Sequence, residues 1–201
     1  MDMITAVNAD VMNNLSATAG VVMYNVSLDG VADAAAFAAL IETNRGKAEN
    51  WIGVTEGDIK VDEGRKSWSP TFNDKRMPFK GDKFLDTAEP KIGFNMLEYI
   101  PENVMLASGA ADKTGSGSHI TVTPRAEYKN EDYKTNVVYA TMIGPEGIYV
   151  VELLNALCIK GLSSTNGDKK AGQLAVEFTG HTADPSKKEM PIKYHFFKAK
   201  A

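Results

Sequence analysis

Five segments in the second half of the chain alternate between apolar and polar residues or run apolar, and short turn clusters separate them. They are rich in β-branched and aromatic residues, which are enriched in strands. The segments span residues 118–128, 135–144, 147–157, 172–180 and 191–197. The turn clusters cover residues 112–118, 128–134, 144–147, 164–170 and 181–188. Strands at this spacing with tight turns predict a mainly β chain built as an antiparallel sandwich or barrel.

The first half begins with a shorter β signal. Apolar and polar residues alternate from Val22 to Leu28. The apolar residues Val22, Tyr24, Val26 and Leu28 fall on one side. This pattern predicts a half-buried strand, and Asp29-Gly30 ends it.

An alanine-rich segment, residues 31–44, follows this strand and predicts a helix. Phe37, Leu40 and Ile41 fall on one helical face. Asp33, or Asp29 just upstream, is placed to cap the helix.

A second, shorter helix is predicted directly after a strand. Pro101 suits the first helical position, and Gly109 suits the left-handed residue that ends a helix. Glu102 favours the positive end of the helix dipole. The strand before it alternates through Ile92, Phe94 and Met96.

Residues 61–86 have a different character. Large apolar side chains occur among charges and turn residues without a steady period, at Trp68, Phe72, Met77 and Phe79. Two interpretations stay open: this segment covers the core as a loop, or it docks on another subunit.

The bulk properties restrict the class of protein. A chain of 201 residues is long enough for one domain with its own core, and residues 1–20 are consistent with a flexible N-terminal arm. The net charge of −4 argues against a protein that binds DNA by neutralising its phosphates. No segment approaches the ~20 apolar residues of a membrane span, and the N-terminus lacks the features of a signal peptide.

No catalytic or metal-binding pattern is found in the sequence. His119, His181 and His195 are too widely spaced to suggest a shared metal. Cys158 is the one cysteine and lies in an apolar setting, which favours a small core residue over a nucleophile. The Gly/Ser run at 115–119 lacks the lysine of a phosphate-binding loop. We therefore expect no enzyme activity and no cofactor.

Four segments in order resemble the major tail tube proteins of long-tailed bacteriophages and prophages. IGVTEGDIKV (52–61) resembles the family's opening of its first long hairpin, and MPFKG (77–81) resembles the return of that hairpin. NMLEYIPENVMLASGA (95–110) resembles its strand-to-helix stretch, and residues 175–197 resemble its closing pair of strands. The sequence departs from the family at Glu56-Gly57-Asp58, where two glycines are usual, and in its alanine-rich stretch.

The resemblance implies a single β-sandwich domain of the tail-tube type, with one or two flanking helices and a long protruding hairpin or loop. It implies hexameric rings that stack into a hollow tube in the virion tail, assembled in the host cytoplasm. Its partners would be other copies of itself and the terminator, tape measure and distal tail proteins. DNA would pass through without specific binding. The alternatives are the tube subunit of a bacteriocin or contractile injection system, and a carbohydrate- or peptide-binding β-sandwich module.

The resemblance also suggests roles for particular residues. Trp68, Phe72, Met77 and Phe79 are the candidate contacts between subunits. Asp58, Asp62 and Glu63 are the candidate acids of the lumen wall, because they follow the first strand of the first long hairpin and because residues 1–100 carry 15 acids against 10 bases.

Overall fold

The structure is a computed structural model of the 201-residue chain. It describes residues 20–47, 49–52, 55–71, 77, 79–144, 147–168, 170–184, 186 and 189–198. The predicted N-terminal arm therefore lies outside the described residues, except for Gly20.

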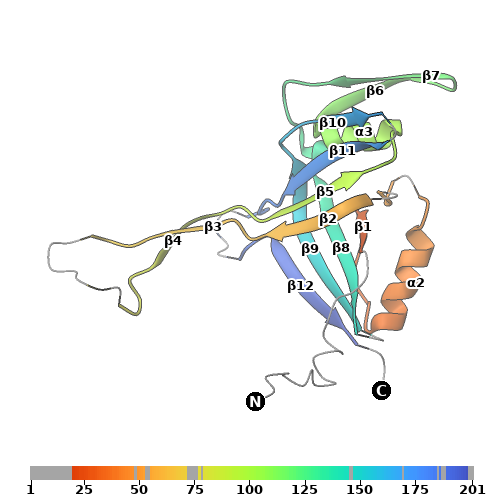
Figure 1. Ribbon diagram of the computed structural model, residues 1–201. Helices are drawn as coiled ribbons and strands as arrows, with labels where there is room; N and C mark the ends of the chain where they lie inside the picture. The colour runs from red at the N-terminus through yellow and green to blue at the C-terminus, as the bar shows by residue number, and fades with distance from the viewer. Residues whose placement is uncertain are drawn as a thin grey trace, which may run out of the picture.

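The chain is mainly β, as predicted from the spacing of its strands (Figure 1). Within the described residues, eight strands form one antiparallel sheet in the order β1-β8-β9-β11-β5-β2, with β12 paired to β9 and β10 paired to β11. These strands are β1 (Val21–Tyr24), β2 (Thr55–Asp62), β5 (Lys91–Met96), β8 (Lys134–Ile143), β9 (Gly147–Cys158), β10 (Ser163–Gly167), β11 (Lys170–Thr179) and β12 (Ile192–Phe197).

Two further ribbons of two strands each form separate small sheets. They are β3 (Arg65–Trp68) with β4 (Phe84–Ala88), and β6 (Ala111–Ser116) with β7 (His119–Pro124). Two short helices complete the fold, α2 (Ala34–Asn44) and α3 (Pro101–Ser108), together with the 3-10 turn η1 (Asn130–Asp132).

Strand β9 joins the two halves of the large sheet. Its first part pairs with β8 and β12, whereas Leu157 and Cys158 at its end pair with β11. Two residues before Leu157, Asn155 has a φ of 45°, in the left-handed region that L-residues other than Asn rarely adopt. Its side-chain amide donates to the carbonyl of His181 at 3.0 Å. Asn155 thus lies just before the point where β9 passes from β8 to β11, between Ala156 and Leu157.

The two halves bury their apolar residues against each other in one core. The alternating residues of β5 and β11 supply one wall, and residues of β1, β8 and β9 supply the other. The buried members include Val22, Tyr24, Ile92, Phe94, Met96, Val137, Val151, Leu153, Leu174, Val176 and Phe178. Burial of Ile92, Phe94 and Met96, and of the three apolar residues of β11, confirms the alternation predicted from the sequence.

A second, smaller core lies under α2. Phe37 is fully buried and stacks on Phe197 of β12, with 5.2 Å between the ring centroids. Asp33 caps the helix, because its carboxylate accepts a hydrogen bond from the Ala36 N–H at 2.8 Å. These observations confirm the predicted helix, its cap and its apolar face.

The second predicted helix is also confirmed. Pro101 lies in the first turn of α3, and Gly109 follows the helix with a φ of 75°. A side chain at Gly109 would meet the carbonyl oxygen of Cys158, since a Cβ built there lies 1.9 Å from it. Glycine is therefore required both by the backbone angle and by the close approach of β9.

The strand predicted from Val22 to Leu28 is wrong in its second half. Strand β1 ends at Tyr24, and Asn25 has a φ of 53°. This turn moves Val26 out of the core that holds Val22 and Tyr24 and into the core under α2. A left-handed residue breaks the two-residue alternation, so the pattern cannot continue through it.

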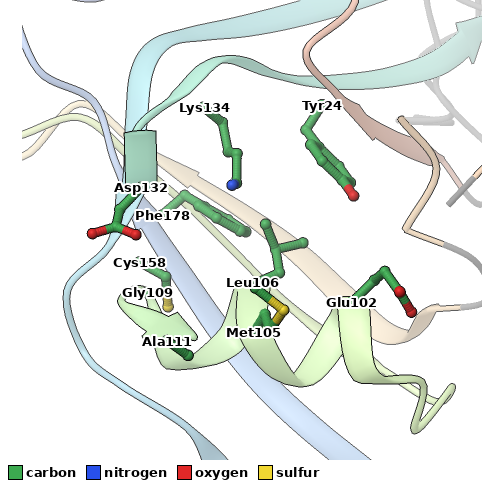
Figure 2. A pocket seen from close by; sticks show the side chains of 10 residues that line it. All are labelled: Tyr24, Glu102, Met105, Leu106, Gly109, Ala111, Asp132, Lys134, Cys158 and Phe178. Carbon is green, nitrogen blue, oxygen red and sulfur yellow. The ribbon is translucent and has the colours of Figure 1, made fainter. Parts of the chain in front are cut away.

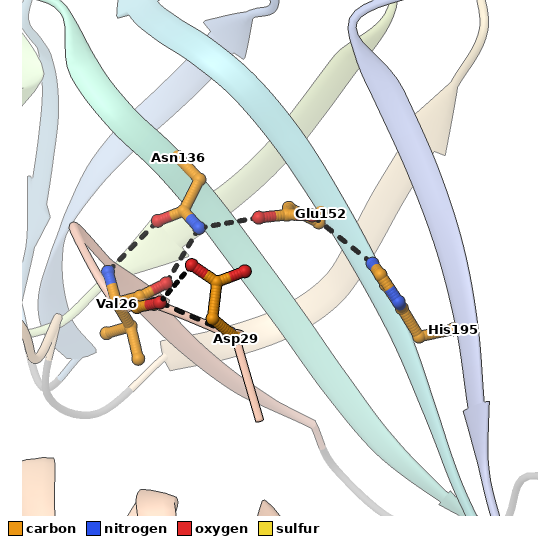
Figure 3. Close-up of polar contacts among 6 residues, drawn as sticks. Val26, Asp29, Asn136, Glu152 and His195 are labelled. Carbon is orange, nitrogen blue, oxygen red and sulfur yellow. Dashed lines mark hydrogen bonds and ion pairs between the residues drawn. The ribbon is translucent and has the colours of Figure 1, made fainter. Parts of the chain in front are cut away.

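A buried amide holds the chain where it leaves β1 (Figure 3). The Asn136 side chain accepts from the N–H of Val26 at 3.0 Å and donates to its carbonyl at 2.8 Å. The same amide donates to the Glu152 carboxylate at 2.7 Å, and His195 of β12 lies 3.2 Å from the other carboxylate oxygen. Because these polar groups satisfy one another, their burial fixes this corner at little cost.

Two turn predictions are also wrong. Residues 112–116 belong to strand β6, and residues 164–167 belong to strand β10. Both strands are almost entirely exposed and polar, so they lack the alternation of apolar and polar residues that would predict a strand. They form because each pairs with a neighbour, β6 with β7 and β10 with β11.

Candidate subunit interface

Strands β3 and β4 continue the main sheet outward as a narrow ribbon. Asp62 of β2 pairs with Lys91 of β5, and Arg65 of β3 then pairs with Ala88 of β4. We call the described residues 65–71, 77 and 79–88 the arm. Figure 1 shows the arm extending away from the body of the molecule.

Gly64 lets the chain pass from the sheet into the arm. Its φ is 57°, and a Cβ added to it would lie 2.2 Å from the carbonyl oxygen of Glu89, in the connection between β4 and β5. The Asp62 carboxylate accepts from the Gly64 N–H at 2.8 Å and supports the turn. The junction therefore depends on glycine, because any side chain would collide with the returning strand.

The arm carries large apolar side chains that are exposed. Trp68 and Phe84 face each other across the ribbon and stack, with ring centroids 5.3 Å apart. Their exposed fractions are 53% and 48%, and Leu85 beside them is 57% exposed. Nearer the tip, Phe79 is 53% exposed and Met77 is 79% exposed.

These exposures argue against the interpretation that this segment covers the core as a loop. Trp68, Met77 and Phe79 do not cover the core of their own chain. Phe72, the fourth candidate contact, lies outside the described residues. Sequence reasoning missed Phe84 and Leu85, which the pairing of β3 with β4 places beside Trp68. An apolar run at 84–85 after a turn was the available signal.

A ribbon of this kind is poorly stable without a partner. An isolated pair of strands is marginal in water, and β3 is exposed at all four residues. Gathered apolar side chains on a protruding element are typical of protein–protein contact sites. The arm is therefore a candidate docking element, because a second surface that covered its exposed apolar side chains would stabilise it.

The candidate lumen acids lie at the base of the arm and differ in their surroundings. Asp58 and Asp62 are exposed on β2. Glu63 is half-buried, pairs with Arg65 at 2.5 Å and accepts a hydrogen bond from the Tyr194 hydroxyl at 3.0 Å. The structure thus leaves Asp58 and Asp62 facing solvent and gives Glu63 a local cation.

The three histidines do not meet. His119 is exposed in the β7 strand, His181 contacts the backbone of Asn155, and His195 lies against Glu152. No three His, Cys, Asp or Glu side chains in the described part of the chain are grouped to hold a metal ion. No helix among these residues is long and apolar enough to cross a membrane.

Cys158 is buried, as predicted. Burial raises the pKa of its thiol, and the thiol lies 3.3 Å from the carbonyl oxygen of Ala107 as a hydrogen-bond donor. A thiol in this state packs as a small apolar group.

The fold and the arm together define the chain in structural terms, as a mainly β subunit with an exposed apolar ribbon. Comparison with known proteins adds no name to this description. No protein-family model matches the chain, and no curated protein matches it.

Proposed function

We propose that this chain is a structural subunit that assembles into closed rings, and that the rings stack into the hollow tail tube of a long-tailed bacteriophage or prophage. The observation that carries the proposal is the arm, with its stacked Trp68 and Phe84 exposed to solvent. The order of the four sequence segments that resemble tail tube proteins supports the same assignment.

The arm suits a ring better than a symmetric dimer. A ring closes when one patch on each copy meets a different patch on the next copy. A protruding element at one side of a body is such a one-sided contact. Completing the burial of a half-exposed Trp or Phe contributes roughly 1 kcal/mol, about half of the value for a whole side chain. Trp68, Phe79 and Phe84, the three such residues in the described part of the arm, supply an anchor at each contact of the ring.

The finer architecture fits the tail-tube type of fold. Two facing half-sheets enclose one core, α2 and α3 flank it, and the first hairpin extends into the arm. The proposal places this hairpin against the neighbouring copy, where the neighbour's surface covers its apolar side chains.

Passage of DNA requires a wall that does not hold phosphate. We assign Asp58 and Asp62 to that wall, because they are exposed acids near the start of the arm. Lysine and arginine contacts with phosphate are what make DNA bind, and acids keep the duplex off the wall over a screening length of ~8–10 Å.

Replacement of Trp68 by Ser tests the proposal. The variant loses the stacked ring and its apolar surface, so we expect it to remain folded and to fail to assemble. Tyr128→Ser is the matched control, because Tyr128 is also an exposed aromatic residue, 49% exposed, but lies on the body of the molecule. We expect Tyr128→Ser to assemble like the unaltered protein.

Sedimentation velocity and circular dichroism measure assembly and folding on the same samples. A Trp68→Ser variant that still forms rings or tubes contradicts the proposal. So does an unfolded Trp68→Ser variant, because an exposed arm residue that supports the fold is not an interface residue.

A further inference from the structure

A pocket lies between α3 and the ends of strands β1, β8 and β9 (Figure 2). Its volume is about 150 Å³. Met105, Leu106, Cys158 and Phe178 supply apolar walls. The side chains of Tyr24 and Lys134 point into the pocket from the strands opposite α3.

Lys134 differs from the other charged groups around this pocket. The Glu102 carboxylate pairs with Lys113 at 2.6 Å, and the Asp132 carboxylate pairs with Arg125 and accepts from the Lys129 N–H. Within the described residues, no ion pair or side-chain hydrogen bond is found for the ammonium group of Lys134. Burial lowers the pKa of Lys134, against the attraction of Asp132, which raises it.

A partly buried ammonium group is costly without an anion paired to it. A bound carboxylate would supply that anion and would accept a hydrogen bond from the protonated Lys134. The Tyr24 side chain also points into the pocket, and burial and nearby carboxylates raise the pKa of its hydroxyl to about 12.

The size and charge of the pocket limit the ligand. An apolar cavity of about 150 Å³ is large enough to hold one benzene molecule. The carboxylates of Glu102 and Asp132 flank the pocket, which disfavours a ligand with two negative charges. The Lys134 ammonium, for which no ion pair is found within the described residues, disfavours a cation.

We propose that this pocket binds a small monoanion with a compact apolar body, such as an aromatic carboxylate of the size of benzoate. Its carboxylate lies between Lys134 and Tyr24, and its ring lies against Leu106, Met105 and Phe178. The proposal is independent of tube assembly, because none of these residues belongs to the arm.

Titration of the purified full-length protein with benzoate, followed by isothermal calorimetry and by protein NMR, tests the site. We expect saturable binding in the millimolar range. Benzamide, which has the same shape without the charge, should bind at least roughly ten-fold more weakly, because a charge-assisted hydrogen bond is lost. Chemical-shift changes should map to α3 and to the residues around Lys134.

Lys134→Met removes the ammonium and keeps the length of the side chain. It should abolish the preference for benzoate over benzamide, whereas Lys129→Met, which removes an exposed charge nearby, should keep it. Absence of saturable benzoate binding, equal binding of benzamide to the unaltered protein, or an unchanged preference in Lys134→Met would each overturn the proposal. The comparison of the two ligands on the unaltered protein decides the question even if Lys134→Met does not fold.

Discussion

Replacement of Asn155 tests the account of how one strand serves both halves of the sheet. Asn155 has a φ of 45°, a conformation that costs an ordinary L-residue about 1–2 kcal/mol. Its amide also donates to the His181 carbonyl at 3.0 Å, a bond of about 1 kcal/mol. Asn155→Ala loses both contributions, so its free energy of unfolding should fall by about 2–3 kcal/mol. Asn155→Gly loses the hydrogen bond but adopts the angle freely, so it should fall by only about 1 kcal/mol.

The order of the two variants is the decisive result. In the middle of an ordinary strand Gly is less stable than Ala by roughly 0.5–1 kcal/mol, so the expected order at Asn155 is the reverse of the usual one. Ala175→Gly on β11 is the control, because this residue pairs regularly with Asn95 and should show the usual order.

Urea unfolding followed by tryptophan fluorescence measures all three variants. The protein concentration must be held fixed, because assembly adds a concentration-dependent stabilisation. An Asn155→Ala variant as stable as Asn155→Gly would refute the claim that the left-handed backbone at this position shapes β9.

Two further predictions follow from named side chains. The neutral Tyr24 phenol is favoured by folding, since its pKa is raised to about 12, so the stability it contributes is fully present below its unfolded value near pH 10 and is lost between about pH 10 and 12. Between pH 8 and pH 11 the urea midpoint should therefore fall further for the unaltered protein than for Tyr24→Phe, and equal falls would contradict this. Reversal of Asp58 and Asp62 to Lys should leave tubes intact and slow DNA ejection, most strongly at low salt. An unchanged ejection rate would remove these two acids from the lumen wall, and Glu63 is left unaltered because its pairing with Arg65 would otherwise be broken.

Much of the fold could be predicted because its signals are local. Asp33, Pro101 and Gly109 mark helix ends by their own side chains or backbone freedom, and the helices lie where these residues indicate. Strands β5 and β11 show their buried faces by strict alternation, because one side of each meets the core.

The rest depended on contacts that are distant in sequence. Strand β10 is polar and exposed, and only its pairing with β11 makes it a strand. The left-handed backbone of Asn155 in β9 lies in a mostly apolar segment, and no neighbouring turn residue predicts it. Asn25 ends β1 early, because its left-handed backbone angle interrupts the alternation of apolar and polar residues. This angle could not be predicted from the sequence.

The candidate site was predicted in part. Trp68, Met77 and Phe79 could be singled out because large apolar residues are unusual among charges and turns. The pairing of Trp68 with Phe84 across the ribbon could not be predicted from the sequence, because the register of β3 with β4 shifts between Lys66 and Ser67. No sequence pattern distinguishes Lys134 from the other lysines. It is partly enclosed because α3 packs against the sheet.

Electron microscopy of the purified, unaltered protein tests the central claim most directly. If the chain is a tube subunit, we expect closed rings with a hollow centre, and stacks of such rings at higher protein concentration. Single particles of the mass of one chain, 21.8 kDa, at every concentration up to the limit of solubility would contradict it.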